Sequence, residues 1–368
     1  MEIGIYTFGD LPAGTRGADA ARRRLDDILA AARLADEAGL HVFGVGEHHR
    51  SDYAVSAHAV VLGAIAAQTR RIRLTSAVTI LSSADPVRVF EDFATLDLLS
   101  GGRAELMAGR GAFVESFPLF GFELQDYDSL FDEKLALLLK MREADRITWQ
   151  GRHRAALHNA EISPQPTGKL PIWVGAGGTP NSAVRAGQAG LPLNLANIGG
   201  EPARFKPFIE LYRHTGLQAG HAPTQLRVAV SGHLHVQRDS QRALEEFFPY
   251  YARYMLHNLP QRDHGWQVSR QAYEQLASPT GSLFVGSPQQ IADKILYEHE
   301  LFGHQRFLAQ LDIGGLPFAK VAGAIELLAT EVLPIVRRAL GSVSTTHREV
   351  GGPMATTPAQ PTGTVAPT

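Results

Sequence analysis

Three ionisable residues stand side by side in the sequence, Glu47, His48 and His49, directly after the apolar segment 41–45. An imidazole changes its charge near neutral pH, so this position could support proton transfer. Successive residues of a strand point to opposite faces, so only one of the two rings can easily point inward. That geometry disfavours a metal ion shared by both rings, and Glu47 is expected to be a structural partner. A loop histidine bonded to a backbone carbonyl is the alternative.

A second stretch, residues 172–182, ends a strand in small residues and begins a helix at Thr179 and Pro180. A helix N-terminus presents free N–H groups and partial positive charge, which suit phosphate. Gly177 and Gly178 would let the backbone approach closely, and hydroxyl groups follow in the first turn. A compact N-capped turn without a ligand is the alternative interpretation.

Arg110 lies between Gly109 and Gly111 at the end of another predicted strand. Its planar guanidinium can donate two hydrogen bonds to a phosphate at once, although a structural ion pair would also explain it. Two phosphate-suited features on neighbouring strands favour one shared anion site. In a barrel enzyme this site would follow strands four and five, whereas strands seven and eight are the more usual place.

Eight apolar segments separated by helical patterns must position these residues. The predicted strands are residues 2–8, 41–46, 72–81, 103–108, 171–175, 191–196, 226–236 and 306–313. Alternating strands and helices indicate an α/β fold, and eight parallel strands close a (β/α)8 TIM barrel with its active site at their carboxyl ends. We expect insertions after strand four, at 148–169 with a hairpin, and after strand seven, at 257–284. An open dinucleotide-binding sheet is disfavoured because only one glycine follows strand one, where that fingerprint needs three.

Composition narrows the classes of partner. The chain has 368 residues, no cysteine and a net charge of −2. Nothing in that balance favours nucleic acid or an anionic membrane surface, and disulfides, thiolate nucleophiles and cysteine metal sites are excluded. Residues 1–341 are predicted to form the barrel. Residues 342–368, rich in Ser, Thr, Pro, Gly and Ala, are predicted to be disordered. Without an apparent signal peptide or membrane span, a cytoplasmic protein is expected.

Several motifs together resemble the bacterial luciferase-like flavin-dependent monooxygenase family over about residues 1–340. They are residues 47–49, 75–81 with 85–88, 96–103, 109–111, 177–180, 284–288 and 331–334. Each motif alone would be weakly specific. The resemblance implies a barrel that binds reduced FMN, commonly as a homodimer. It also implies an oxidoreductase that uses this FMN and O2 to oxygenate a small organic substrate through a flavin peroxide.

The resemblance also implies site residues. His48, the first histidine of the pair, would be catalytic, and no metal is expected. The cofactor-binding residues would be Ala77, Val78, Arg110, Gly111, Gly177, Gly178, Thr179 and Ser182. Ala77 and Val78 would form a non-proline cis peptide beneath the flavin ring. Reduced FMN would come from an NAD(P)H:flavin reductase, and a deazaflavin remains an open alternative.

Two positions depart from the catalytic subunit of luciferase. Leu130 stands near the place of a second phosphate-binding arginine, and Gly109 stands at the place of a reactive cysteine. These differences argue against light emission. They leave the substrate undetermined within the broader oxidoreductase branch.

Two rival functions stay open at this point. His233 and His235 form an H-x-H pair that, with Asp312, could suggest a metal-dependent hydrolase. In hydrolase barrels of that kind the pair lies on the first strand, whereas here it lies on the seventh; the two rings could instead line the substrate end of a pocket. The other rival is a non-catalytic flavin-binding subunit, which the presence of His48 disfavours.

Overall fold

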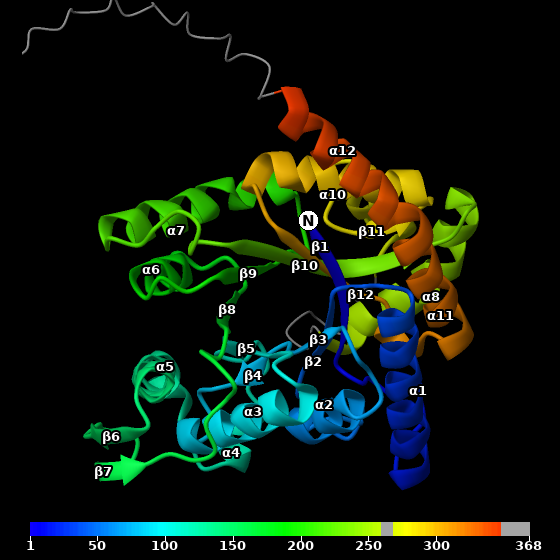
Figure 1. Ribbon diagram of the computed structural model, residues 1–368. Coiled ribbons are helices and arrows are strands. Elements are labelled where there is room, and N and C mark those ends of the chain that lie inside the picture. The colour runs from blue at the N-terminus through cyan, green and yellow to red at the C-terminus, as the bar shows by residue number, and fades with distance from the viewer. Residues whose placement is uncertain (259–267, 347–368) are drawn as a thin grey trace, which may run out of the picture.

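Eight parallel strands form a closed ring, which confirms the predicted (β/α)8 barrel (Figure 1). The computed structural model describes residues 1–258 and 268–346, with side chains as far as Gly341. The ring strands follow one another in chain order, and pairing of the eighth with the first closes the circle. They are β1 (Glu2–Thr7), β2 (Val42–Val45), β3 (Arg73–Ser76), β5 (Ala104–Gly109), β8 (Ile172–Ala176), β9 (Leu193–Ala196), β10 (Val228–Val236) and β12 (Arg306–Gln310).

The third predicted strand is in fact two short strands. β3 ends at Ser76, and β4 (Thr79–Ile80) continues beside β5 after the Ala77–Val78 peptide, which is cis as expected. The first insertion contains the predicted hairpin, formed by β6 (Arg146–Trp149) and β7 (Leu157–Glu161). An unpredicted strand, β11 (Phe284–Gly286), begins where the second insertion ends and pairs with β10 outside the ring.

Helices surround the ring and pack their apolar faces on it. They are α1 (Ala18–Glu37), α2 (His58–Ala66), α3 (Pro86–Ser100), α4 (Ser116–Leu119), α5 (Tyr127–Glu143), α6 (Pro180–Gln188), α7 (Lys206–Gln218), α8 (Ser240–Asn258), α9 (Arg270–Ala277), α10 (Pro288–Phe302), α11 (Phe318–Leu327) and α12 (Leu333–Thr346). Short 3₁₀ turns span Leu124–Asp126, Pro202–Phe205 and Ile313–Gly315, and a π turn at Leu328–Val332 joins α11 to α12. None of the described helices is long and apolar enough to cross a membrane.

Charged residues close the amino-terminal end of the barrel. The Arg306 guanidinium is fully buried, donates to Glu105 at 2.6 Å and 3.0 Å and to Glu2 at 2.8 Å, and lies over the Trp173 ring at 4.3 Å. A buried charge is tolerated when it is paired and its hydrogen bonds are satisfied, as they are here. The opposite, carboxyl end of the strands is therefore the end left to form a site.

The end of the chain differs in part from expectation. Helix α12 continues to Thr346, five residues past the predicted barrel boundary at 341. Extending an existing helix requires only one ordered residue per added hydrogen bond, so residues of poor helix propensity can still join it. Residues 347–368 of the predicted disordered tail, and 259–267 of the second insertion, lie outside the described residues.

Candidate active site

A cavity of about 510 Å³ opens at the carboxyl ends of the barrel strands. Its size and its largely apolar lining, with a few polar groups, are typical of a cofactor or small-molecule site. Most of the predicted site residues line it: His48, Ala77, Val78, Arg110, Gly111, Gly177 and Thr179. The other two, Gly178 and Ser182, lie beside Thr179 on the turn that enters α6. The sequence therefore placed these residues in one site.

Arg110 and two hydroxyl groups meet at the start of α6. The Arg110 Nη2 donates to Thr179 Oγ1 and to Ser182 Oγ, both at 3.0 Å, and the two hydroxyl oxygens are 2.8 Å apart. Thr179 is the N-cap residue of α6, yet its side chain makes no capping hydrogen bond. Both hydroxyls are thus turned to the guanidinium at the N-terminal turn of the helix. Such a cluster can hold a phosphate group.

Two of the predicted glycines are required by the backbone. Gly178 has a φ of 99°, and a Cβ there would lie 2.4 Å from the Phe205 ring. Gly111 has a φ of 84°, and a Cβ there would lie 2.9 Å from Ile80. Residues with a side chain rarely adopt these conformations. The glycines thus shape the rim on both sides of Arg110.

The cluster includes two charged residues and an aromatic ring that sequence reasoning missed. The Asp128 carboxylate accepts a hydrogen bond from Arg110 Nη1 at 2.6 Å. It also lies 3.5 Å from the guanidinium of Arg185, which lies on α6 and is the second cation here. The Arg110 guanidinium also lies over the Tyr127 ring at 5.1 Å. Leu130 stands near the place of a second phosphate arginine, as the sequence shows, and Arg185 lies on another helix, so no motif near position 130 indicates this cation.

The cis peptide forms part of the cavity wall. Both Ala77 and Val78 line the cavity. A Cβ at Gly109 would lie 2.4 Å from Val78, and one at Gly175 would lie 2.7 Å from the same side chain. Glycine on the two neighbouring strands therefore makes room for Val78. The result is an apolar surface beside Arg110.

His48 points into the cavity, and His49 does not line it. The His48 Nδ1 lies 3.1 Å from the Glu115 carboxylate, and its ring stacks on Tyr53 at a centroid distance of 4.1 Å. Burial raises the Glu115 pKa, but the hydrogen bond from His48, a backbone hydrogen bond and the charges of His48 and Arg50 together outweigh burial and leave the pKa below its usual value. When Nδ1 donates to this carboxylate, Nε2 is the proton-free nitrogen. One ring lies in the cavity and one outside it, as expected, but both residues lie in the loop after β2, which ends at Val45, so strand alternation is not the reason.

Glu47 is a structural partner, as expected, although it also borders the cavity. Its carboxylate lies 2.7 Å from His58 Nδ1 and 3.8 Å from His49 Nε2, and it accepts from the Ile80 backbone N–H at 3.1 Å. Burial raises the Glu47 pKa, but these partners together outweigh burial and hold it at about 2. The carboxylate thereby ties the end of β2 to α2 and β4.

This depressed pKa gives a prediction about stability. A carboxyl group with a pKa of about 2 in the folded chain and 4.5 when unfolded stabilises the fold above pH 4.5, and the stabilisation is lost as the pH falls towards 2. The shift corresponds to roughly 3 kcal/mol. We expect Glu47→Gln to lower the free energy of urea unfolding by about that amount at pH 7 and by much less at pH 3. Exposed Glu37→Gln is the control; parallel pH profiles for wild type and Glu47→Gln would contradict the assignment.

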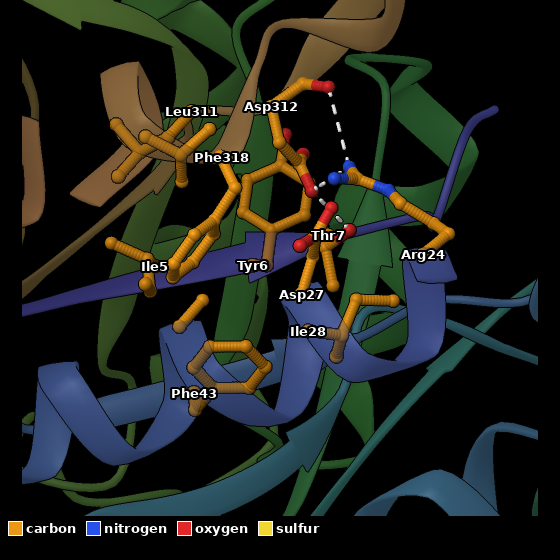
Figure 2. A pocket seen from close by; sticks show the side chains of 12 residues that line it. Ile5, Tyr6, Thr7, Arg24, Asp27, Ile28, Phe43, Leu311, Asp312 and Phe318 are labelled. Carbon is orange, nitrogen blue, oxygen red and sulfur yellow. Dashed lines mark hydrogen bonds and ion pairs between the residues drawn. The ribbon is translucent and has the colours of Figure 1, made fainter. Parts of the chain in front are cut away.

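The residues of the hydrolase alternative do not come together. His235 Nε2 pairs with Glu246 at 2.9 Å, His233 faces the cavity, and Asp312 is bound by Arg24 and by the Thr7 hydroxyl (Figure 2). Figure 2 shows the Arg24 side chain reaching from α1 to the Asp312 carboxylate. Among the described residues, no group of three or more His, Cys, Asp or Glu is placed to hold a metal. The expectation that both histidines line the pocket holds for His233 alone.

Comparison with known proteins adds to this geometry. A family described as luciferase-like monooxygenase matches residues 1–305. N-acetyl-S-alkylcysteine monooxygenase of Bacillus subtilis is 35% identical over 192 residues, covering 51% of this chain and 56% of that protein. The chain spans about half the length of such curated relatives.

Solved structures share the fold. The oxygenating constituent of 3,6-diketocamphane monooxygenase from Pseudomonas putida, in complex with FMN, superposes with a TM-score of 0.73 at 20% identity, covering 91% of this chain and 98% of that one. An F420-dependent secondary alcohol dehydrogenase superposes with a TM-score of 0.71 at 18% identity, covering 91% and 99%. At these identities the likeness establishes the barrel architecture.

Proposed function

Because the chain belongs to the luciferase-like monooxygenase family, we propose that it is a flavin-dependent monooxygenase that uses reduced FMN and O2 to oxygenate a small organic substrate. The observation that carries the proposal is the cluster of Arg110, Thr179 and Ser182 beside the cis Ala77–Val78 wall. A cation, two hydroxyls and a helix N-terminus match a terminal phosphate. The apolar wall formed by Ala77 and Val78 next to them suits a planar ring. Bound reduced FMN would supply the two electrons that O2 needs.

Different residues of this chain would bind the phosphate, support the ring, transfer a proton and exclude water. Arg110, Thr179 and Ser182, with the backbone at Gly111, Gly177 and Gly178, hold the phosphate, and Ala77 and Val78 support the ring. His48 Nε2 exchanges a proton with the substrate or with the reacting oxygen atoms, while the Glu115 carboxylate orients the imidazole. Phe8, Phe113, Tyr254 and Met255 give the cavity an apolar side that excludes water.

The phosphate assignment is tested by comparing FMN with riboflavin, which lacks the phosphate. We expect FMN to quench protein fluorescence with an affinity about 10-fold higher or more, because charge-assisted hydrogen bonds are lost with the phosphate. Equal affinities would overturn the assignment. F420 titrated in parallel decides whether a deazaflavin serves instead, since a relative of each cofactor type shares the fold.

Oxygenation is tested by supplying reduced FMN from an NAD(P)H:flavin reductase, which is the expected partner. N-acetyl-S-alkylcysteines, cyclic ketones and aliphatic aldehydes form the first panel, because the names of relatives include an N-acetyl-S-alkylcysteine, a diketocamphane and an alkanal monooxygenase. Incorporation of ¹⁸O from ¹⁸O2 would mark true oxygenation. The cytoplasmic location stays a prediction.

A homodimer is proposed from the surface of α2, which is apolar on nearly every face. Val60 on α2 is 73% exposed and Leu99 on the adjacent α3 is 67% exposed. A helix without a polar face is expected to be covered. Light scattering should give twice the chain mass, and Val60→Glu should give a monomer. Leu217→Glu on α7 is the matched control, and a monomeric wild type would refute the assignment.

A further inference from the structure

A row of polar side chains crosses the inner wall of the cavity on the side away from Val78. Tyr6 on β1, Gln310 on β12 and His233 on β10 are direct neighbours in the strand register. All three line the cavity, as does Asn194 on β9. The proposed phosphate cluster and the His48–Glu115 pair use none of them.

Several atoms of this row lack a protein partner. Within the described part of the chain, no hydrogen bond reaches Gln310 Nε2 or Oε1, His233 Nδ1 or Asn194 Oδ1. These side chains are at most 5% exposed. Folded proteins rarely leave buried polar groups unsatisfied, because each then costs its full desolvation penalty. All four atoms belong to side chains that line this one cavity, so a partner bound there, with a small adjustment of the side chains, would satisfy them.

The row carries no charge at neutral pH. Burial lowers the His233 pKa to about 4, so the imidazole is neutral, and burial likewise raises the Tyr6 pKa above its usual value. The Asp312 carboxylate, two residues after Gln310, already binds Arg24 and Thr7 (Figure 2), and the Glu47 carboxylate, which lines the same cavity, is held by His58 and the Ile80 backbone. An anion would find no cation in the row, and an ammonium group would find no free carboxylate. The partner should therefore be neutral.

The hydrogen-bond donors and acceptors of the row further limit the chemical class of the bound partner. The Gln310 amide offers one N–H donor and one acceptor in a single plane, which matches a carbonyl beside an N–H. Met107 and Leu308 supply apolar contacts below the row. We propose that this row binds a neutral carbonyl–N–H edge, as found in amides, lactams, imides and uracil-like rings. The inference deepens the proposed function and rests on it, since the edge could belong to the oxygenated substrate or to the flavin.

The test uses four probes of similar size: benzamide, benzoate, benzylamine and ethylbenzene. Their binding to flavin-free and to FMN-loaded protein is measured by calorimetry or ligand-observed NMR. We expect benzamide to bind at least about 10-fold more tightly than the other three, because a site built for hydrogen bonds rejects ligands that cannot make them. Gln310→Leu should reduce benzamide affinity to the ethylbenzene level. Exposed Gln289→Leu is the control, and His233→Leu is a second variant in case Gln310→Leu fails to fold.

The outcomes show whether the carbonyl–N–H edge belongs to the substrate or to the flavin. Benzamide binding to FMN-loaded protein, lost in Gln310→Leu, assigns the edge to the substrate. Benzamide binding only to flavin-free protein, together with an FMN affinity lowered at least about 10-fold by Gln310→Leu, assigns it to the flavin. No preference for benzamide, or unchanged binding of both ligands in the variants, overturns the inference. If FMN does not bind at all, the proposed function fails, and benzamide binding to the flavin-free protein still decides on the row.

Discussion

Arg110→Ala is expected to weaken FMN binding by about 10- to 100-fold, the range for losing hydrogen bonds to a charged group. The guanidinium now bonds Thr179 and Ser182, and only a phosphate placed there would depend on all three groups. Riboflavin affinity should stay within about 2-fold of wild type, since its ring contacts do not involve the arginine. Fluorescence titrations with both flavins measure the two effects. Arg88→Ala, with a 72% exposed side chain, is the control.

A second variant should act in the opposite direction. Asp128 competes for Arg110 and would face the incoming phosphate with a like charge. Asp128→Asn is therefore expected to strengthen FMN binding by about 2- to 5-fold, with the gain shrinking at high salt because the carboxylate is exposed. A loss of affinity in Asp128→Asn, or an equal loss for riboflavin and FMN in Arg110→Ala, would place the phosphate elsewhere.

His48→Ala is expected to lower the oxygenation rate by about 100- to 10,000-fold, the usual contribution of a positioned acid or base. FMN affinity should remain within a few-fold of wild type, because His48 lies apart from the phosphate cluster. The measurement is turnover of whichever panel substrate is oxygenated, alongside an FMN titration. His158→Ala, an exposed histidine on β7, is the control. Unchanged turnover would make His48 a packing residue.

Glu115 positions the His48 ring. Its test therefore needs a measurement that would not change if Glu115 only contributed to packing. Glu115→Gln keeps a hydrogen-bond acceptor for Nδ1 and should hold the oxygenation rate within a few-fold of wild type. Glu115→Ala leaves Nδ1 without this acceptor, so the ring is no longer oriented and the maximal rate should fall by about 10-fold or more. A rate unchanged in Glu115→Ala, or lowered equally in both variants, would show that this hydrogen bond does not position His48 for turnover.

Sequence patterns were sufficient where one local signal determines one local structure. The apolar segments predicted the ring strands, and Asp85 and Ser287, each directly before a proline, cap α3 and α10. The glycine-flanked Arg110 and the turn before α6 could be joined because consecutive parallel strands lie side by side. Of the adjacent histidines, one ring lines the cavity and the other does not, as expected, although both lie in the loop after β2 and not on the strand.

The features that the sequence did not predict depend on contacts between distant parts of the chain. Glu115 reaches His48 across 67 residues of sequence, and no motif connects them. Arg185 joins Arg110 only through Asp128, which lies on a different helix. No motif marks the unpaired amide of Gln310, because a missing hydrogen bond leaves no trace in the sequence. Strand β11 was missed because its three residues are too short for a period of two to be visible.

The Arg306 network at the amino-terminal end of the barrel has a consequence for how stability is distributed. Ion pairs from Arg306 to Glu2 and Glu105 stabilise that end of the barrel. The opposite end can therefore contain groups that destabilise the fold, such as the Gln310 amide, which has no hydrogen-bond partner. A barrel built in this way should be most stable when a ligand is bound in its cavity. Its melting temperature should respond to small molecules in the mouth far more than to substitutions around the braced base, which makes thermal-shift screening a direct route to its natural ligand.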